Sequence, residues 1–250
     1  MINAPSLYRL CNLVGIPPQK WMISNPFKIY EYEVVTEGVR LGPTHTILDL
    51  GCGKGHWTIM LARHCCTAIG VDISKEAIAF AQKFVRCSSL KKRVRFLAAY
   101  LEETNLPSNS LDFAFSFCVL EHVSDLEETL AALVRLLKPS GEFHFSVDAL
   151  MSIRDEALLE KHRRDHHVVR YFTPAFLRQK MEEAGFEVME IRPILTGDFA
   201  RQEFERRIRY GYRQNLFRRL RLVRAFREHD RSGESSEGIM LVGRVRRPAR

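Results

Sequence analysis

Residues 49–55, Asp-Leu-Gly-Cys-Gly-Lys-Gly, decide the fold of this 250-residue chain. The apolar run Thr46–Leu48 precedes them and a helical pattern from about His56 to His64 follows, so they form a turn between a strand and a helix. Glycine adopts positive φ at little cost, and a turn without Cβ atoms lets a ligand approach the backbone closely. The stretch therefore predicts a binding turn for a nucleotide-like ligand.

The spacing of the glycines excludes two common nucleotide-binding motifs. The dinucleotide fingerprint Gly-x-Gly-x-x-Gly fails, because the sixth position counted from Gly51 is His56. A P-loop needs four residues between its glycines and then Gly-Lys-Ser/Thr, which this stretch also lacks. The remaining pattern, acid-x-Gly-x-Gly-x-Gly, resembles the first motif of the class I S-adenosylmethionine (SAM) dependent methyltransferases.

The resemblance implies SAM as the cofactor and S-adenosyl-L-homocysteine as its product. SAM has no phosphate but carries an ammonium, a carboxylate and a sulfonium, so the Asp49 carboxylate is expected to serve its cationic parts. Free backbone groups of the turn would meet the polar parts. The turn contributes five expected cofactor-binding residues, which are Asp49, Gly51, Cys52, Gly53 and Gly55.

An acid also ends the second predicted strand, Thr67–Asp72. Ligands of open α/β sheets bind at the carboxyl edge of the strands, so Asp72 is placed to accept hydrogen bonds from both ribose hydroxyls. Its alternative role is to cap the next helix, but Ser74 can cap that helix unaided. We therefore expect Asp72 and its neighbour Ile73 at the cofactor.

A third strand, Val94–Ala99, leads into Tyr100-Leu101-Glu102, where the resemblance places the adenine ring. Similar methyltransferases carry an aspartate after this strand, but Tyr100 aligns with that position. Either Glu102 supplies the acid, or Tyr100 stacks on the ring and the backbone makes the polar contact. Tyr100, Leu101 and Glu102 are all expected near the adenine.

The fourth predicted strand and the residues after it resemble two further family elements. Leu111–Phe117 is similar to the strand Phe-Asp-x-Val, and Cys118–Val123 is similar to the sequence Leu-Glu-His-Val that continues it. Phe117, the last residue of this strand, is expected at the cofactor. These elements look most like the broad type 11 group, which methylates small molecules, lipids, quinones and sugars.

The alternation of strands and helices predicts the rest of the fold. A helix over Leu126–Lys138 and a fifth strand over Glu142–Val147 continue the pattern, and strands 187–194 and 238–245 would close the sheet as an antiparallel hairpin. We expect an α/β fold with a doubly wound, mostly parallel, seven-stranded Rossmann-like sheet. The expected parts are an N-terminal helical lid (1–43) and a SAM-binding domain (44–250) with inserts at 149–171 and 196–236.

Composition fits one domain with additions. The chain is 46% hydrophobic, and no stretch has the 18 or more uninterrupted apolar residues of a membrane span. Its N-terminus lacks a secretory pattern, and its six cysteines form no Cys-x-x-Cys pair. A reduced, cytoplasmic location is the simplest prediction. The oligomeric state stays open.

The charge is concentrated at the C-terminal end. Residues 1–200 hold 23 Lys/Arg and 24 Asp/Glu, whereas residues 201–250 hold 15 and 6. Within the range 201–231, apolar residues recur at helical spacing among eleven arginines, which predicts one basic amphipathic helix, or two broken near Gly211. Such a helix could pack on the domain with solvated arginines, lie on an anionic membrane surface, or contact nucleic acid. In the second of these cases the protein would be peripheral to the membrane.

Methyl transfer to a hydroxyl requires a base, and a histidine with a pKa near neutrality suits that role. His122, just beyond the fourth strand, is the leading candidate, although the Glu-His pair could instead cap the following helix. Other candidates are Asp148 at the end of the fifth strand and the histidines of the first insert, which are His162, His166 and His167.

No metal site is predicted. His162 and His166 share a helix face at spacing i, i+4, but the sequence offers no set of further ligands. Some quinone O-methyltransferases with a similar strand-end motif bind a divalent ion, which could involve Glu121 and His122. This chain has Cys118 where an additional acid would help.

The acceptor can be narrowed by what the sequence lacks. The Asn/Asp-Pro-Pro-Tyr/Phe motif of enzymes that methylate nucleobase amines is absent, because Ser116–Val119 stands in its place. The Pro-Cys setting of cytosine-C5 enzymes is absent as well. We expect a SAM-dependent methyltransferase that acts on a hydroxyl of a small molecule or a lipid- or sugar-linked acceptor. An RNA methyltransferase and a non-catalytic SAM-binding protein are the alternatives.

Overall fold

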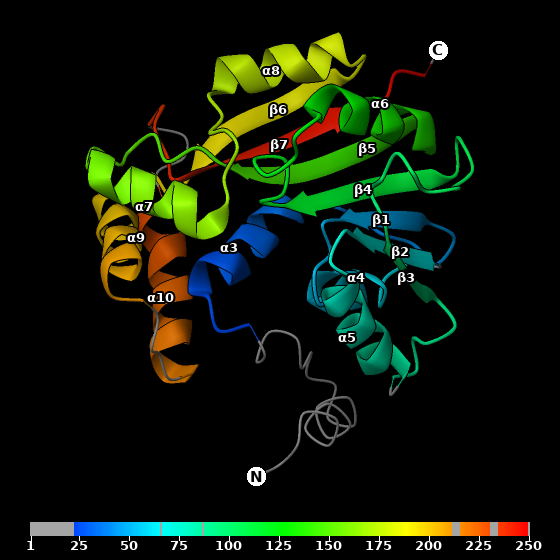
Figure 1. Ribbon diagram of the computed structural model, residues 1–250, viewed down its shortest axis with the longest axis horizontal. Coiled ribbons are helices and arrows are strands. Elements are labelled where there is room, and N and C mark those ends of the chain that lie inside the picture. The colour runs from blue at the N-terminus through cyan, green and yellow to red at the C-terminus, as the bar shows by residue number, and fades with distance from the viewer. Residues whose placement is uncertain (1–22, 66, 87, 212–215, 231–234, 250) are drawn as a thin grey trace.

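The computed structural model describes residues 23–249, apart from residues 66, 87, 212–215 and 231–234. Seven strands form one sheet in the order β3-β2-β1-β4-β5-β7-β6 (Figure 1). They are β1 (Thr46–Leu50), β2 (Thr67–Asp72), β3 (Val94–Ala98), β4 (Leu111–Phe117), β5 (Leu137–Asp148), β6 (Glu187–Ile194) and β7 (Met240–Arg246). β7 pairs antiparallel with β5 and β6, and the other described pairs are parallel. The predicted doubly wound, mostly parallel sheet is confirmed.

Helices cover both faces of the sheet (Figure 1). They are α3 (Pro26–Val35), α4 (His56–Leu61), α5 (Lys75–Arg86), α6 (Leu126–Leu136), α7 (Glu156–His166), α8 (Pro174–Glu183), α9 (Asp198–Tyr210) and α10 (Leu216–His229). Side-chain caps fix where three of these helices begin. Backbone N–H groups in the first turns of α3, α6 and α8 donate to the side chains of Asn25, Asp125 and Thr173, respectively.

Alternating side chains of the strands build two apolar layers. Ile47 of β1 packs into the layer that includes α3, α4, α5 and α10, whereas Leu48 packs into the layer that includes α6 and α8. In β5, Phe143 and Phe145 point to the α6 and α8 layer. The alternate residues of β5 are polar and buried beneath the other layer: His144, Ser146 and Asp148. The core is therefore polar near the carboxyl end of β5.

Most predicted elements form where the sequence indicates, but β5 is longer than expected. It begins at Leu137, so Pro139–Gly141, which separate the predicted helix from the predicted strand, lie within the strand. The pairing with β4 shifts register between Leu111 and Phe113, which accommodates this irregular start. The basic segment forms two helices, α9 and α10, with Gly211 at positive φ (+72°) after α9.

The helix α3 packs against α10, β5 and β7 rather than standing apart from the sheet. Residues 1–22 of the predicted lid lie outside the described residues, and the predicted domain boundaries stay predictions. The helices α9 and α10 pack together, with the Phe199 ring centroid 5.9 Å from that of Phe226. Within the part of the chain that the structure describes, no helix is long and apolar enough to span a membrane.

Candidate active site

The glycine turn after β1 lies against β2 and leaves room for a ligand. The backbone N–H groups of Gly51 and Cys52 both donate to the carbonyl oxygen of Val71, at 2.8 and 3.0 Å. Gly51 has φ +68°, and a Cβ there would lie 2.3 Å from Val119 Cγ2. Gly53 has φ +51°, but a Cβ there would meet no atom within 4 Å. Glycine at 51 thus serves packing, and glycine at 53 faces open space.

Asp72 ties the end of β2 to this turn. Its Oδ2 accepts the N–H of Gly53 at 2.7 Å, and its Oδ1 accepts the N–H of Ser74 at 2.9 Å. The Ser74 hydroxyl accepts the N–H of Ala77 at 3.2 Å, so Ser74 caps α5 as the sequence indicates. The carboxylate of Asp72 is therefore fixed in orientation at the carboxyl edge of the sheet.

A cavity of about 540 Å³ lies at this edge. Its lining consists of residues 50–51, 71–73, 99–102, 118–119 and 122–125 together with Thr129. The predicted cofactor residues among them are Gly51, Asp72, Ile73, Tyr100, Leu101 and Glu102, and the predicted base His122 also lines the cavity. A glycine turn, a fixed carboxylate and the half-exposed Tyr100 ring in one hollow suit the parts of SAM.

Five predicted cofactor residues do not line this cavity: Asp49, Cys52, Gly53, Gly55 and Phe117. A Cβ at Gly55 would lie 2.5 Å from the Phe96 ring, so Gly55 allows the turn to pack on β3. The Phe117 ring stacks on Tyr32 of α3, with centroids 5.6 Å apart. Cys52 is buried, and a contact of these residues with the cofactor stays a prediction.

Asp49 is buried beneath the turn. Its Oδ2 accepts the hydroxyl of Thr58 in α4 at 2.5 Å, which joins β1 to the helix that follows. Burial raises the pKa of Asp49 to about 7, the Thr58 hydrogen bond opposes this rise, and the charge of Asp72 adds to it. In this position Asp49 holds the turn and does not line the cavity, and its contact with the cationic parts of SAM stays a prediction.

Among the predicted base candidates, His122 lines the cofactor cavity, whereas His162 and His166 line a separate cavity beside α7. His122 is exposed, and its Nδ1 lies 3.4 Å from the carbonyl oxygen of His167. Burial is the main cause that lowers the pKa of both His162 and His166, and the charge of His122 contributes to both shifts. The rings of His162 and His166 lie on the same side of α7, with their centroids 4.5 Å apart.

His162 is held on both ring nitrogens. Its Nε2 lies 3.6 Å from Oδ2 of Asp148, and its Nδ1 lies 3.0 Å from the hydroxyl of Tyr171. Burial lowers the pKa of His162 to about 4, although the carboxylate of Asp148 acts to raise it. At neutral pH this imidazole is uncharged, and it orients Asp148 rather than standing free for an acceptor.

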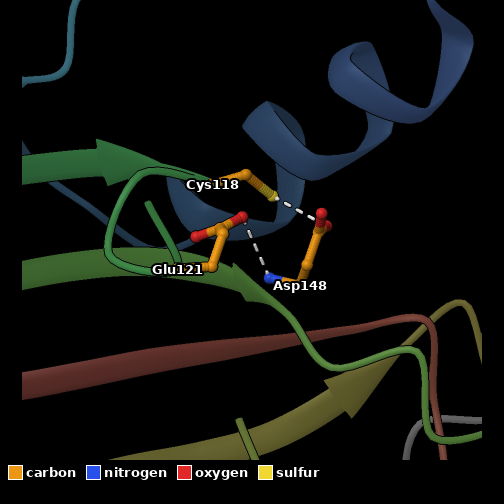
Figure 2. Close-up of side chains that lie close together, drawn as sticks. All are labelled: Cys118, Glu121 and Asp148. Atoms are coloured by element: carbon orange, nitrogen blue, oxygen red, sulfur yellow. Dashed lines mark hydrogen bonds between the residues drawn. The ribbon is translucent and has the colours of Figure 1, made fainter. Parts of the chain in front are cut away.

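Three potential metal ligands meet where β4 and β5 end (Figure 2). One ligand atom from each of Cys118, Glu121 and Asp148 lies within 4.8 Å of the others. The thiol of Cys118 donates to Asp148 Oδ1 at 3.4 Å, and Glu121 Oε1 accepts the N–H of Asp148 at 3.2 Å. Burial, and then the charge of Asp148, raises the pKa of Glu121 well above its usual range.

The structure supplies a cation to this cluster from α3. The ammonium of Lys28 lies 3.0 Å from Oε2 of the fully buried Glu31 and donates to the carbonyl oxygen of Phe117 at 3.4 Å. Burial acts to lower the pKa of Lys28, but the charges of Cys118, Glu31 and the two other acids outweigh it and raise that pKa. Lys28 already balances part of the negative charge that a metal ion would neutralise.

Sequence reasoning missed the contribution of α3. Glu31 also accepts the hydroxyl of Ser146 at 2.5 Å, so a helix that precedes the first strand reaches the end of the fifth. The signal is a Lys-x-x-Glu pair, residues 28 and 31, within an otherwise mainly apolar helix. Charged side chains on the apolar face of a helix need polar partners when that face is buried. The spacing of residues along the chain does not show which residues are these partners.

Comparisons with known proteins agree with this geometry. Residues 48–145 match the protein-family model described as a methyltransferase domain. A probable S-adenosylmethionine-dependent methyltransferase of Mycolicibacterium smegmatis is 28% identical over 154 residues, which cover 60% of this chain and 55% of the relative. A ubiquinone biosynthesis O-methyltransferase of Methylococcus capsulatus is 29% identical over 164 residues, which cover 61% of this chain and 69% of that protein.

The crystal structure of the YcgJ protein from Bacillus subtilis shares the fold. Its TM-score is 0.63 at 18% identity, and the match covers 88% of this chain and 99% of that one. The chain spans about half the length of the first curated relatives that it matches.

Proposed function

Because this chain carries a class I SAM-dependent methyltransferase domain, we propose that it transfers the methyl group of SAM to a hydroxyl oxygen of a small molecule. The ubiquinone biosynthesis O-methyltransferase among its relatives supports oxygen as the acceptor atom. We place the protein in the cytoplasm, and the cofactor in the cavity that Gly51, Asp72 and Tyr100 line.

The observation that carries the proposal is the position of His122 on the cofactor cavity. With its proton on Nδ1, the His122 ring can donate a hydrogen bond to the carbonyl oxygen of His167. In this tautomer the lone pair of Nε2 is available to accept a proton. In the proposed step the acceptor hydroxyl gives its proton to Nε2, its oxygen takes the methyl group, and the sulfonium leaves as S-adenosyl-L-homocysteine. Positioning the two reactants together supplies much of the rate.

The test measures cofactor binding and turnover separately. Calorimetry with SAM and S-adenosyl-L-homocysteine should give saturable binding by the unaltered chain and by His122→Asn. Turnover of a panel of phenolic hydroxyl acceptors should fall by about 100-fold in His122→Asn, the usual scale of general-base catalysis. His64→Asn is the matched control, because its exposed side chain lies outside the cavity lining, and it should retain turnover.

Three results would contradict the proposal. Absence of binding to SAM and to its product would remove the methyltransferase assignment for this chain. Full turnover by His122→Asn would remove His122 as the base and return Asp148 and the histidines of α7 as candidates. Binding of SAM without turnover of any acceptor would favour a SAM-binding protein that does not transfer the methyl group.

We also infer that the helices α9 and α10 contact an anionic membrane surface. The inner side of α10 is buried, including Arg219, which donates to the carbonyl oxygen of Ile23 at 2.8 Å. Tyr210 at the end of α9, with Phe217 and Leu220 at the start of α10, is strongly exposed, at 81%, 78% and 54% respectively. Exposed apolar residues among arginines suit an interface with acidic lipids.

Sedimentation with vesicles tests this contact. The chain should bind vesicles that contain phosphatidylglycerol and not vesicles of phosphatidylcholine alone, and added salt should weaken the binding. The pair Phe217→Glu and Leu220→Glu should abolish it, whereas Phe176→Glu on α8 should not. Retention of RNA under conditions where vesicles are not bound would favour the nucleic-acid alternative, and retention of neither would leave α9 and α10 as packing helices.

A further inference from the structure

The segment that follows α7 is joined to the loop that follows β4. The backbone N–H groups of Val169 and Arg170 both donate to the carbonyl oxygen of Glu121, at 2.9 and 3.2 Å. The backbone N–H of Phe172 donates to the carbonyl oxygen of Asp148, the last residue of β5, at 3.3 Å. The main chain of this segment therefore contacts both the loop and the end of the neighbouring strand.

The side chain of Arg170 makes a second connection to the same loop. Its Nη1 donates to the carbonyl oxygen of Val123 at 2.9 Å, and its Nη2 donates to the carbonyl oxygen of Ser124 at 3.0 Å. A guanidinium holds its donors in a rigid planar fork, and hydrogen bonds from a charged donor are stronger than neutral ones. Because the fork spans two consecutive carbonyl groups, it fixes the orientation of both peptide units.

The residues around Arg170 hold it in place. Val168 and Phe172 on its two sides are buried, and the backbone N–H of Val168 donates to the carbonyl oxygen of Arg163 in α7 at 2.9 Å. Ordering a flexible segment costs conformational entropy, whereas a segment that is already anchored loses little more. The hydrogen bonds of the guanidinium are therefore offset only slightly by the ordering of the backbone that carries it.

The part of the loop that Arg170 holds forms one wall of the cofactor cavity. Residues 122–125 line this cavity, and the proposed base His122 is among them. The start of the loop has a support of its own, because Val119 packs so closely on Gly51 that a Cβ there would lie 2.3 Å from it. Arg170 therefore acts on the stretch that carries the imidazole.

The ring of His122 has only a weak contact of its own. It is exposed, and its Nδ1 lies 3.4 Å from the carbonyl oxygen of His167, which is long for a hydrogen bond. The backbone that carries the ring must therefore set its position. On one side the N–H of His122 donates to the carbonyl oxygen of Val119 at 2.9 Å, and on the other Arg170 binds the carbonyl oxygen of Val123.

We propose that Arg170 is a positioning residue for methyl transfer, because its guanidinium holds the loop that carries His122 at the cofactor cavity. The catalytic part rests on the proposed role of His122, whereas the hold on the loop does not. A base must lie within hydrogen-bond reach of the proton that it takes, and a loosened loop is in that geometry for less of the time. Gly51, Asp72 and Tyr100 line the cavity from the ends of β1, β2 and β3, so losing the guanidinium should affect turnover more than SAM affinity.

Arg170→Ala tests both parts. Hydrogen exchange in residues 121–125 should accelerate more than exchange in β1, and SAM affinity measured by calorimetry should change by less than about threefold. The kcat for the phenolic acceptor that the unaltered chain methylates fastest should fall about tenfold, with little change in KM for SAM. Arg135→Ala is the matched control, because this guanidinium also donates to a backbone carbonyl, that of Leu106 at 3.2 Å, but outside the cavity lining. It should retain kcat and the exchange rates of residues 121–125.

Two further measurements distinguish the guanidinium fork from its charge and from general stability. Millimolar guanidinium chloride should restore part of the turnover of Arg170→Ala, because the ion can donate to the same carbonyl groups. It should not restore turnover of His122→Asn, which lacks the base. Arg170→Lys keeps the charge but has no planar fork, so its kcat should stay lowered.

Unchanged exchange in residues 121–125 of Arg170→Ala would overturn the hold on the loop. Full turnover by Arg170→Ala or by Arg170→Lys would overturn the positioning role, and so would an equal fall in Arg135→Ala or an equal rescue of His122→Asn. Absence of turnover by the unaltered chain, together with faster exchange in Arg170→Ala, would contradict the proposed methyl transfer and still confirm that Arg170 holds the loop.

Discussion

The carboxylate of Asp72 at the end of β2 accepts the backbone N–H of Gly53 at 2.7 Å, and this bond holds the glycine turn that follows β1. The same side chain lines the cofactor cavity. Asp72→Ala should therefore weaken SAM binding by about 1–3 kcal/mol, because buried polar groups lose hydrogen-bond partners. Calorimetry measures the change. Glu76→Gln, an exposed acid of α5 outside the cavity lining, should bind SAM as the unaltered chain does.

Gly51 and Gly53 should respond differently to the same substitution. Gly51→Ala places a methyl group 2.3 Å from Val119 at positive φ, so it should lower the free energy of unfolding by several kcal/mol. Gly53→Ala meets no neighbour and should cost only about 1–2 kcal/mol for the left-handed backbone. Urea denaturation compares the two variants. Equal losses would contradict the role of Val119 in fixing the turn.

Gly53→Ala also reports on the cofactor. If the cofactor approaches the open space beside Gly53, the added methyl group should reduce SAM affinity in a chain that is otherwise folded. Unchanged affinity would show that the cofactor does not approach that residue.

The raised pKa of Asp49 predicts an unusual dependence of stability on pH. Its pKa is about 7 in the folded chain against an ordinary value of 3.8, so the folded state binds more protons between these values. Stability then falls as pH rises through this window and levels off above about pH 7. The variant Asp49→Asn has no carboxyl group to titrate at this position. Its free energy of unfolding minus that of the unaltered chain should therefore rise by about 2–3 kcal/mol between pH 5 and pH 8.

Asp112 supplies the control for this measurement. Burial acts to raise its pKa, but hydrogen bonds from Lys138 and from the N–H of Thr46 outweigh it and lower that pKa. Asp112 is therefore ionised throughout the range from pH 5 to pH 8. In urea denaturation, Asp112→Asn should change the free energy of unfolding by the same amount at every pH in this range. If the curve of Asp49→Asn against pH also runs parallel to that of the unaltered chain, the pKa of Asp49 is not raised.

Lys28 and Glu31 should be strongly coupled. The side chain of Glu31 is fully buried and that of Lys28 is 30% exposed, with 3.0 Å between Nζ and Oε2. Lys28→Met leaves the carboxylate of Glu31 without its cation and should lower the free energy of unfolding by about 2–4 kcal/mol. The double variant with Glu31→Gln should lose less than Lys28→Met alone. Additive losses in urea denaturation would contradict the coupling.

The fold was predictable because its signals are local. Thr67–Asp72, Leu111–Phe117 and Glu187–Ile194 form strands at the predicted bounds, since each is a short apolar or alternating run between turn residues. The start of β5 was missed because Pro139–Gly141 reads as a break, yet the register shift against β4 accommodates these residues.

The candidate site was predictable only in part. The glycine turn and Asp72 lie on consecutive strands, and parallel strands bring their carboxyl ends to one edge, so spacing along the chain indicates proximity. The contact between Glu31 and Ser146 joins residues 115 positions apart and depends on how α3 packs. No periodicity specifies such packing. Asp49 shows a related limit: the sequence places it next to the glycine turn, but spacing does not show that its carboxylate is buried and accepts the hydroxyl of Thr58.

Asp230, which follows α10, fixes the position of α3. Its Oδ2 accepts the hydroxyl of Tyr30 at 2.6 Å and the N–H of Leu195 at 3.0 Å, and its Oδ1 accepts the hydroxyl of Thr196 at 3.1 Å. Asp230→Ala leaves these donors without their shared acceptor and should cost about 2–4 kcal/mol of unfolding free energy. Hydrogen exchange in residues 26–35 should accelerate more than exchange in β1.

The matched control is Asp198→Ala at the start of α9, where the carboxylate is exposed and pairs with Arg201. This variant should change stability by less than about 1 kcal/mol, as exposed ion pairs do. Since Lys28 reaches the Cys118 cluster from α3, loosening α3 through Asp230→Ala should also reduce methyl transfer while SAM binding is retained. Unchanged exchange in α3 together with full turnover would show that Asp230 does not hold this helix in place.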